Sequence, residues 1–270
     1  MPRMKFTLIL LLFCSCSVIE RKVYSPTQIN NPSLQEKNDH SFSITYSTPS
    51  GFDLNGGWAV TNRLALIGGG YFYKNKDNEE DNEILSSRRA KSLLLYKHKG
   101  FHGGLGLYIP LSKKNHETYA SFFGGYTYGS FSMNENHTVY DINSSSLPVS
   151  TISFYKSNIG RWFLQGGFNF YGKSFEVSFL TRYNYVDYSH IVTDYTDFEQ
   201  YSYNLPPYGS SPSQFMDFAL DSKIFFSDKH RFALDLFLSG TSRLNRKDFD
   251  SYYYPFRLGI GMVMRNPFKN

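Results

Sequence analysis

The sequence is poor in cysteine, in charge and in long apolar runs. Its two cysteines, Cys14 and Cys16, both stand near the start of the 270 residues, so the rest of the chain has no thiol for a disulfide framework or a cysteine metal site. Charged residues make up 19 %, below the roughly 25 % of ordinary soluble domains. No apolar run of about 20 residues follows the N-terminal region, which excludes a protein that spans a membrane with helices.

Sequence signatures of enzymes and of nucleic-acid binding are also missing. There is no Gly-x-Ser-x-Gly elbow, phosphate loop or dinucleotide fingerprint, and the histidines have no metal-ligand spacing. The 28 basic residues outnumber the 23 acidic ones by a formal net charge of +5, too small a surplus to indicate a nucleic-acid partner. The sequence therefore predicts no cofactor, no metal and no nucleic acid.

Aromatic residues and glycines are abundant instead. Phe, Tyr and Trp make up 18 % of the chain, and from His40 onward they recur in segments of about 10 residues with alternating polarity. The last segment is the clearest, because one face carries Arg257 and glycines while the other face is apolar throughout. This apolar face consists of Tyr252, Tyr254, Phe256, Leu258, Ile260, Met262 and Met264. Long apolar bands are typical of strands that face lipid, whereas a soluble β-sandwich, the alternative, does not need them.

These segments predict an all-β fold: a single antiparallel up-and-down transmembrane β-barrel of about ten strands, within about 8–12. The predicted strands are 40–49, 52–61, 63–73, 94–110, 117–131, 159–171, 174–187, 214–226, 230–240 and 251–265. Connections are short at 61–62, 112–116, 172–173 and 227–229, and longer at 74–93, 132–158, 188–213 and 241–250, with one short exception at 49–51. Short periplasmic turns and long external loops are the usual asymmetry of bacterial outer-membrane barrels.

The N-terminal region indicates export. Residues 1–15 have a positively charged start and a short apolar stretch, the features of a signal peptide. Cys16 follows the small residue Ser15, as in a bacterial lipobox, and is the predicted lipidation site; ordinary signal cleavage nearby is the alternative. Residues 16–39 are polar and predict a periplasmic tether, and residues 40–270 form the barrel. Both termini are then expected in the periplasm.

Several short motifs resemble a known family. The run Lys22-Val23-Tyr24-Ser25-Pro26, then Asn30-Asn31-Pro32, and the segments Gly51-Phe52-Asp53-Leu54 and Ala59-Val60-Thr61-Asn62 are similar to the outer-membrane β-barrel lipoproteins common in Bacteroidota. The resemblance implies a bacterial outer-membrane location and a β-barrel. It supplies no catalytic residues.

The inward faces of the predicted strands carry opposite charges. A barrel of about eight strands is just filled by its side chains, whereas a porin lumen needs about sixteen strands, so we interpret these groups as a polar network that fills the lumen. A narrow path for small solutes is the alternative, although Tyr119, Phe123 and Phe163 also point inward and narrow the space. The lumen polar network consists of Arg161, Glu176, Arg182, Asp217, Asp221, Lys223, Asp235 and Arg257.

Two of the long connections carry acidic groups. Omptin proteases are ten-stranded barrels with Asp and His pairs at the outer rim, so a rim hydrolase is an alternative for the loop 188–213, although no spacing here matches such a site. The residues concerned are Asp187, His190, Asp194, Asp197 and Glu199. The tyrosine-rich stretch 201–208 favours a recognition or packing surface instead. The acidic run 74–87 predicts a solvated loop that could bridge to lipopolysaccharide through divalent cations.

The sequence thus predicts an outer-membrane barrel lipoprotein with a structural or surface-interaction role, a lumen largely plugged by side chains, and no enzymatic activity. Its expected partners are outer-membrane lipid and, through the long loops, lipopolysaccharide or a surface ligand. The narrow channel and the rim hydrolase stay open as alternatives. The sequence indicates nothing about the oligomeric state.

Overall fold

The computed structural model describes residues 21–48, 51–82, 88–111, 118–141, 147–210, 212–226, 231–245 and 252–266. Within these ranges the chain is mostly strand, with one short helix, α2 (Asp197–Ser202), and no helix there is long or apolar enough to cross a membrane. The strands are β1 (Lys22–Tyr24), β2 (His40–Ser47), β3 (Gly51–Ala59), β4 (Leu64–Asn82), β5 (Arg88–Pro110), β6 (Thr118–Asp141), β7 (Val149–Tyr171), β8 (Phe175–Thr193), β9 (Ser213–Phe225), β10 (Phe232–Arg243), β11 (Tyr252–Tyr253) and β12 (Phe256–Arg265).

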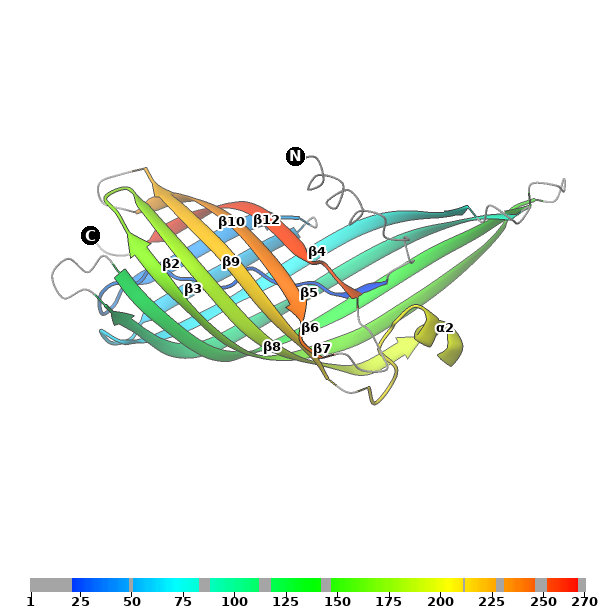
Figure 1. The fold of residues 1–270 in the computed structure, drawn as a ribbon, viewed down its shortest axis with the longest axis horizontal. Coiled ribbons are helices and arrows are strands. Elements are labelled where there is room, and N and C mark those ends of the chain that lie inside the picture. The colour runs from blue at the N-terminus through cyan, green and yellow to red at the C-terminus, as the bar shows by residue number, and fades with distance from the viewer. Residues whose placement is uncertain are drawn as a thin grey trace, which may run out of the picture.

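Ten of these strands close into one antiparallel barrel (Figure 1). From β2 to β10 each strand pairs with the next along the chain, and β12 then pairs with both β10 and β2. The closing register runs from Ser41 opposite Arg265 to Ser47 opposite Gly259. The all-β, up-and-down barrel predicted from the sequence is confirmed. Within the closed part of the barrel no strand edge is left unpaired, which is the condition for a sheet to stand in lipid; β4 beyond Tyr73 pairs with β5 alone.

The outer wall of the barrel is apolar and the inner wall is polar. On β12, Leu258 and Ile260 are 62 % and 51 % exposed, whereas Arg257 beside them is buried. On β7, Trp162 projects outward and its neighbour Arg161 is buried. Because side chains alternate across a strand, this pattern separates a continuous apolar exterior from a lumen that holds the charges.

Four strands continue far beyond this wall. β4 continues to Asn82 and β5 begins at Arg88, and β6 and β7 are as long as β5 to within one residue. These four strands project together past the barrel (Figure 1). We call this part the extension. The loops predicted at 74–93 and 132–158 are therefore wrong over most of their length.

The cause of this error is an inversion of polarity along the strands. On β6, Tyr128 faces outward and is 44 % exposed, but beyond it Phe131 and Met133 are buried on the inner face and Asn134 is exposed on the outer face. The alternation persists while its apolar side changes from outside to inside. A search for outward apolar bands consequently stops at the inversion, although the strand continues.

Residues 21–39, which we call the lumen segment, run through the barrel and are mostly buried; Glu36, Lys37 and Asn38 are exposed near the start of β2. Val23, Ile29 and Leu34 are at most 3 % exposed, and the polar residues between them are almost as deeply buried. The expectation of a periplasmic tether is corrected for this part of the chain. Its Thr, Gln, Asn and Ser side chains can form hydrogen bonds with a polar barrel wall, which makes burial of a segment without an apolar face favourable.

The lumen segment runs through the barrel lengthwise. At one end the Lys37 backbone donates to Asn62, in the short connection between β3 and β4. At the other end β1 pairs in parallel with β11, and Arg21 contacts Glu135 in the extension. The chain therefore enters the lumen at the extension end and begins β2 at the short-turn end. The predicted signal peptide, residues 1–15, and Cys16 lie outside the described residues.

The predicted loop 188–213 is partly ordered secondary structure. β8 continues to Thr193, and α2 follows with a capping box in which Thr196 and Glu199 bind each other's backbone N–H groups. Leu205, just after the helix, is fully buried in an apolar cluster with Val23 and with residues of the extension. This loop therefore covers the inner face of the extension.

Candidate functional site: the filled lumen

Arg257 on β12 holds the lumen segment by its backbone. The guanidinium donates to the carbonyl of Pro26 at 2.5 Å, to a carboxylate oxygen of Asp53 at 2.8 Å, and to the hydroxyl of Ser47. Tyr73 also donates to Asp53, and its ring centre lies 4.6 Å from the guanidinium carbon. Each of these side chains is buried, so the ion pair has the hydrogen-bond partners that a buried pair requires.

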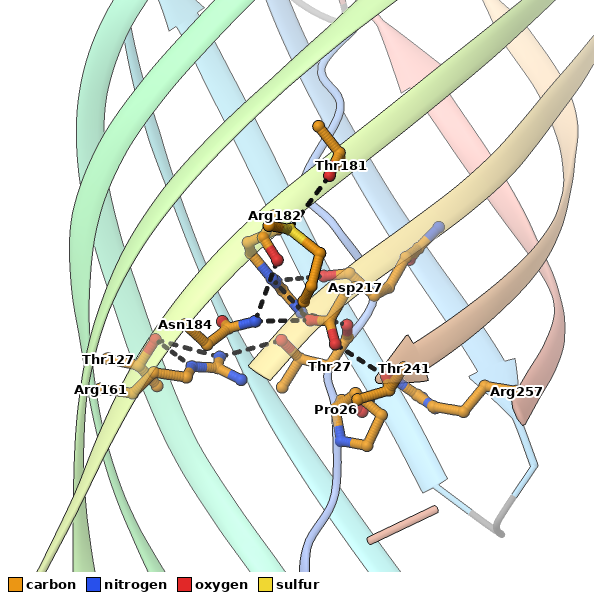
Figure 2. Close-up of polar contacts among 12 residues, drawn as sticks. Pro26, Thr27, Thr127, Arg161, Thr181, Arg182, Asn184, Asp217, Thr241 and Arg257 are labelled. Carbon is orange, nitrogen blue, oxygen red and sulfur yellow. Dashed lines mark hydrogen bonds and ion pairs between the residues drawn. The ribbon is translucent and has the colours of Figure 1, made fainter. Parts of the chain in front are cut away.

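A second arginine cluster binds the next two residues of the segment, Thr27 and Gln28 (Figure 2). Arg182 on β8 donates to the carbonyl of Thr27 at 2.7 Å and to that of Gln28 at 3.3 Å, and it pairs with Asp217 on β9 at 2.8 Å. Arg161 on β7 donates to the Thr27 hydroxyl at 2.9 Å. Two adjacent strands thus hold Thr27, and Asp217 on a third strand holds Arg182 in place.

The Gln28 side chain lies across the lumen. Its amide nitrogen donates to Asp235 on β10 at 3.0 Å, its amide oxygen accepts from Asn55 on β3 at 3.0 Å, and its backbone N–H donates to Asp53 at 3.2 Å. Thr45 adds a hydrogen bond to the same oxygen of Asp235. One residue of the segment therefore joins strands on both sides of the β12–β2 seam.

A lysine-centred cluster holds the following turn. Lys223 on β9 donates to the carbonyl of Asn31 at 2.8 Å and pairs with Glu176 on β8 at 2.9 Å. The Asn31 amide donates to Asp221 at 3.2 Å, and Ser33 donates to Glu176. Lys223 therefore lies between the wall carboxylates Glu176 and Asp221, while further hydrogen bonds of this cluster go to Asn31 and Ser33 of the segment.

The segment ends in a charged turn at the short-turn end. Arg265 of β12 pairs with Asp39 at 3.1 Å, and the backbone N–H groups of Gln35 and Glu36 donate to the same carboxylate. Burial alone would raise the pKa of Asp39, but these two N–H groups and the arginine hold that pKa below its ordinary value. Leu34, just above, packs in an apolar cluster of the wall. The ionised carboxylate thus fixes the turn that leads into β2.

At the extension end the segment is held by an ion pair within an aromatic cluster. Arg21 pairs with Glu135 of β6 at 2.7 Å and lies 4.4 Å from the ring centre of Tyr203. Tyr195 donates its hydroxyl to Glu135 at 2.5 Å. Burial is the larger cause and this hydrogen bond the smaller one of a pKa of Tyr195 well above its ordinary value. Tyr24 stacks on Phe215 with ring centres 4.1 Å apart.

The structure brings the sequence-predicted lumen residues together around the segment. All eight are buried on the inner wall. Asp217 is bound by other wall residues, and the remaining seven contact the lumen segment directly: Arg161, Glu176, Arg182, Asp221, Lys223, Asp235 and Arg257. They were interpreted as filling the lumen by pairing with one another, but the main chain and side chains of residues 21–39 fill it with them.

Sequence reasoning missed several residues of the site. Asp53 is central to the site. The sequence indicated its inward direction, because this single acid lies between Phe52 and Leu54, which both face outward. Glu135 fell in a predicted loop, so its inward direction was not foreseen. Asn184 and Thr241 complete the hydrogen bonds of Asp217, but a neutral inward residue gives no distinctive signal.

The rim residues proposed for hydrolysis have other neighbours. Asp194 accepts the backbone N–H of Phe154 at 2.7 Å, and Glu199 belongs to the cap of α2. Asp187 is exposed on the outer face of β8, and His190 has a positive φ of 49° near the end of that strand. Asp197 stands in the first turn of α2. In the part of the chain described, no group of three or more His, Cys, Asp or Glu residues is placed to hold a metal ion.

The acidic run 74–87 is not a free loop in its described part. Its backbone is strand β4 as far as Asn82. Asp77 pairs with Lys22 of the lumen segment at 3.6 Å and accepts a hydrogen bond from Asn75. The charge of Asp77 therefore serves the contact between the segment and the extension.

Comparison with known proteins finds similar solved structures of outer-membrane proteins but no matching protein family. No family model matches the chain, and no curated protein sequence matches it. Among solved structures, the outer membrane protease OmpT from Escherichia coli is similar with a TM-score of 0.48 and 9 % identity, over 84 % of this chain and 90 % of that one. An outer membrane channel from Pseudomonas putida F1 has a TM-score of 0.32 and 12 % identity, over 88 % and 100 %. Acinetobacter baumannii CarO has a TM-score of 0.29 and 8 % identity, over 86 % and 99 %. Likeness at this level transfers no function to this chain.

Proposed function

We propose that this protein is a bacterial outer-membrane barrel that is sealed by its own N-terminal segment and that holds a rigid extension outside the membrane as a surface for interactions. The observation that carries the proposal is the lumen segment, because residues 26–33 occupy hydrogen-bonding groups from strands all around the wall. A solute path would need that polar surface to be free for water. The apolar outer wall supports insertion in a membrane.

The extension supports a role at the surface. Its outer face carries exposed polar residues such as Asn134 and Lys156 beside exposed apolar ones such as Ile152. Its inner face is closed by the apolar cluster that includes Leu94, Met133, Tyr155 and Leu205. A hairpin pair with its own core keeps a fixed shape beyond the membrane, as a binding platform requires. The exposed Tyr201 and Tyr208 lie in the neighbouring loop and offer contact area of the kind used in recognition.

The course of the segment sets the orientation of the N-terminus in this proposal. Short turns face the periplasm in bacterial barrels, so the extension lies on the cell exterior and the C-terminal end of β12 lies on the periplasmic side. Arg21 lies at the extension end, and Cys16 is five residues before it, a reach of about 17 Å when fully extended. A lipid on Cys16 then belongs to the outer side. For the N-terminus, this proposal differs from the expectation that both termini are periplasmic.

The test of the seal is ionic current and solute flux through the full-length protein refolded in lipid vesicles. We expect vesicles as tight as those without protein. Reproducible, size-limited flux would overturn the proposal. A variant with Asn31→Cys and Ser178→Cys, whose native side chains are 2.9 Å apart, should form a disulfide that fixes the segment to β8. Flux that persists in the oxidised form would show that the path does not depend on movement of the segment.

The test of orientation is proteolysis of intact cells. A protease recognition site inserted just before Arg21 should be cut from outside, whereas the same site inserted in the turn at Gly172-Lys173 should be cut only after lysis. Protection of the first site in intact cells would overturn the orientation. Loss of acyl labelling in a Cys16→Ala variant tests the lipid separately.

A further inference from the structure

Five lysines stand on the outer face where the barrel becomes the extension. They come from β4, β5 and β7, and each is exposed. We call them the lysine collar: Lys74, Lys76, Lys97, Lys99 and Lys156.

The strand register places these positive charges side by side. Lys74 is directly opposite Lys97, and Lys97 is opposite Ser132, which is in turn opposite Lys156. Lys99 is diagonal to Lys74, because it pairs with the preceding outward residue of β4. Like charges at directly opposed positions of a sheet repel each other, so this arrangement is unfavourable unless anions lie among them.

Two exposed carboxylates are described on this side, Asp187 of β8 and Asp194 just after it, and Asp194 accepts the backbone N–H of Phe154. Among the residues whose side chains the structure describes, no ion pair joins any of the five lysines to a carboxylate; Lys156 instead lies 5.3 Å from the ring centre of Phe154. Asp77 alternates to the inner side of β4 and pairs with Lys22. The exposed Asp187 of β8 stands opposite Gly160 rather than opposite a lysine.

The collar also has a defined depth. Aromatic side chains end the outward apolar band directly beneath it: Phe72 is opposite Lys99, and Phe101 is opposite Tyr128. Phe101 is 64 % exposed and Phe72 is 49 % exposed. Aromatic girdles of transmembrane barrels lie at the membrane interface, and flexible lysine side chains one or two positions further reach the level of lipid head groups.

We propose that the lysine collar binds the phosphate groups of anionic lipids in the leaflet at the extension end. The occupant is membrane lipid rather than a soluble anion because the charges follow an arc on the outer wall, continuous with the lipid-facing band, and do not surround a pocket. The proposal rests on membrane insertion of the barrel, part of the proposed function, and does not depend on whether the lumen is sealed.

The experiment measures binding of phosphatidic acid to the full-length barrel folded in zwitterionic detergent micelles. A Lys74→Gln/Lys97→Gln variant should bind about 25-fold more weakly, since each lysine near an anionic surface contributes roughly fivefold in affinity. An Arg63→Gln/Lys173→Gln variant removes the same charge from exposed residues at the short-turn end and should bind as the parent does. Raising the salt concentration should weaken binding to the parent.

Two results would overturn the proposal. One is equal affinity of the parent and the collar variant for phosphatidic acid while both stay folded, as judged by electrophoretic mobility before heating. The other is that soluble polyphosphate saturates the collar and prevents lipid binding at equal phosphate concentration, which would identify a free polyanion as the occupant. If the barrel conducts ions and also binds phosphatidic acid through the collar, the proposal of a sealed lumen is overturned and the proposal of a lipid-binding collar stands.

Discussion

The interior of the barrel and the interior of the extension are built in opposite ways from the same strands. Within the barrel, β7 directs Arg161 inward and Leu164 outward; in the extension the same strand directs Tyr155 inward and Lys156 outward. The lumen segment follows this change, with polar contacts to Arg182 and aromatic contacts around Tyr24.

The difference indicates where the surrounding medium changes. A strand in lipid must place its apolar side chains outside, and its polar ones collect in the lumen; a strand in water gains free energy by the reverse arrangement. In the proposed function, the inversion between Tyr128 and Phe131 on β6 is therefore the expected membrane boundary on the extension side. Four predictions test this contrast.

The largest effect is expected from loss of a charge in the barrel interior. Arg257→Met leaves Asp53 buried without its cation, and breaking a buried pair in this way costs about 3–5 kcal/mol in the free energy of unfolding. Urea unfolding of the folded barrel in detergent measures it. Arg257→Met combined with Asp53→Asn should recover part of the loss. Parental stability of the single variant would mean that the pair is unimportant.

A lysine scan of the outer face locates the inversion directly. Leu164→Lys on β7 places a charge in the apolar band and should destabilise the barrel in vesicles by about 2–4 kcal/mol. Asn134→Lys on β6, exposed beyond the inversion, should change stability by less than about 0.5 kcal/mol. Equal effects at both positions would contradict the proposed boundary.

The aromatic end of the lumen segment should respond more weakly. Tyr195→Phe removes one hydrogen bond from Glu135 but leaves the ion pair with Arg21, a loss of about 1 kcal/mol. Faster proteolytic cleavage of the loop around α2 is the expected readout. Tyr201→Phe, on an exposed side chain of that loop, is the matched control and should be cleaved at the parental rate.

The smallest effect concerns pH at the short-turn end. Because the folded-state pKa of Asp39 is lowered, its ionised form stabilises the turn at pH values above the ordinary carboxylate range, and this contribution is lost as pH falls through the folded pKa. Unfolding free energy measured from pH 6 down to acid should therefore decline. Asp39→Asn should be less stable at pH 6 and decline less steeply, and an unchanged slope would contradict the assignment.

The sequence predicted the barrel well because period-two alternation and outward apolar side chains repeat along the strands of the closed barrel. It failed at the extension for the reason given above: near Lys97 and Lys99 the apolar side changes, and the pattern resembles a solvated loop. It failed again at residues 21–39, since a segment stabilised by hydrogen bonds to distant residues such as Arg182 and Lys223 has no local periodicity. Inward charges can be recognised from alternation, but their partners cannot.

The attachment of the lumen segment to β2 constrains how the barrel assembles. β2 is one side of the seam that closes the sheet, and the segment doubles back along the same wall, where Asn30 binds the carbonyls of Gly56 and Gly68. Passing residues 21–39 through a finished, filled barrel would require breaking its polar contacts one after another. These contacts favour an order of assembly in which the sheet closes around a segment already laid on its first strands, with the contact of Arg257 to Pro26 formed as β12 joins β2.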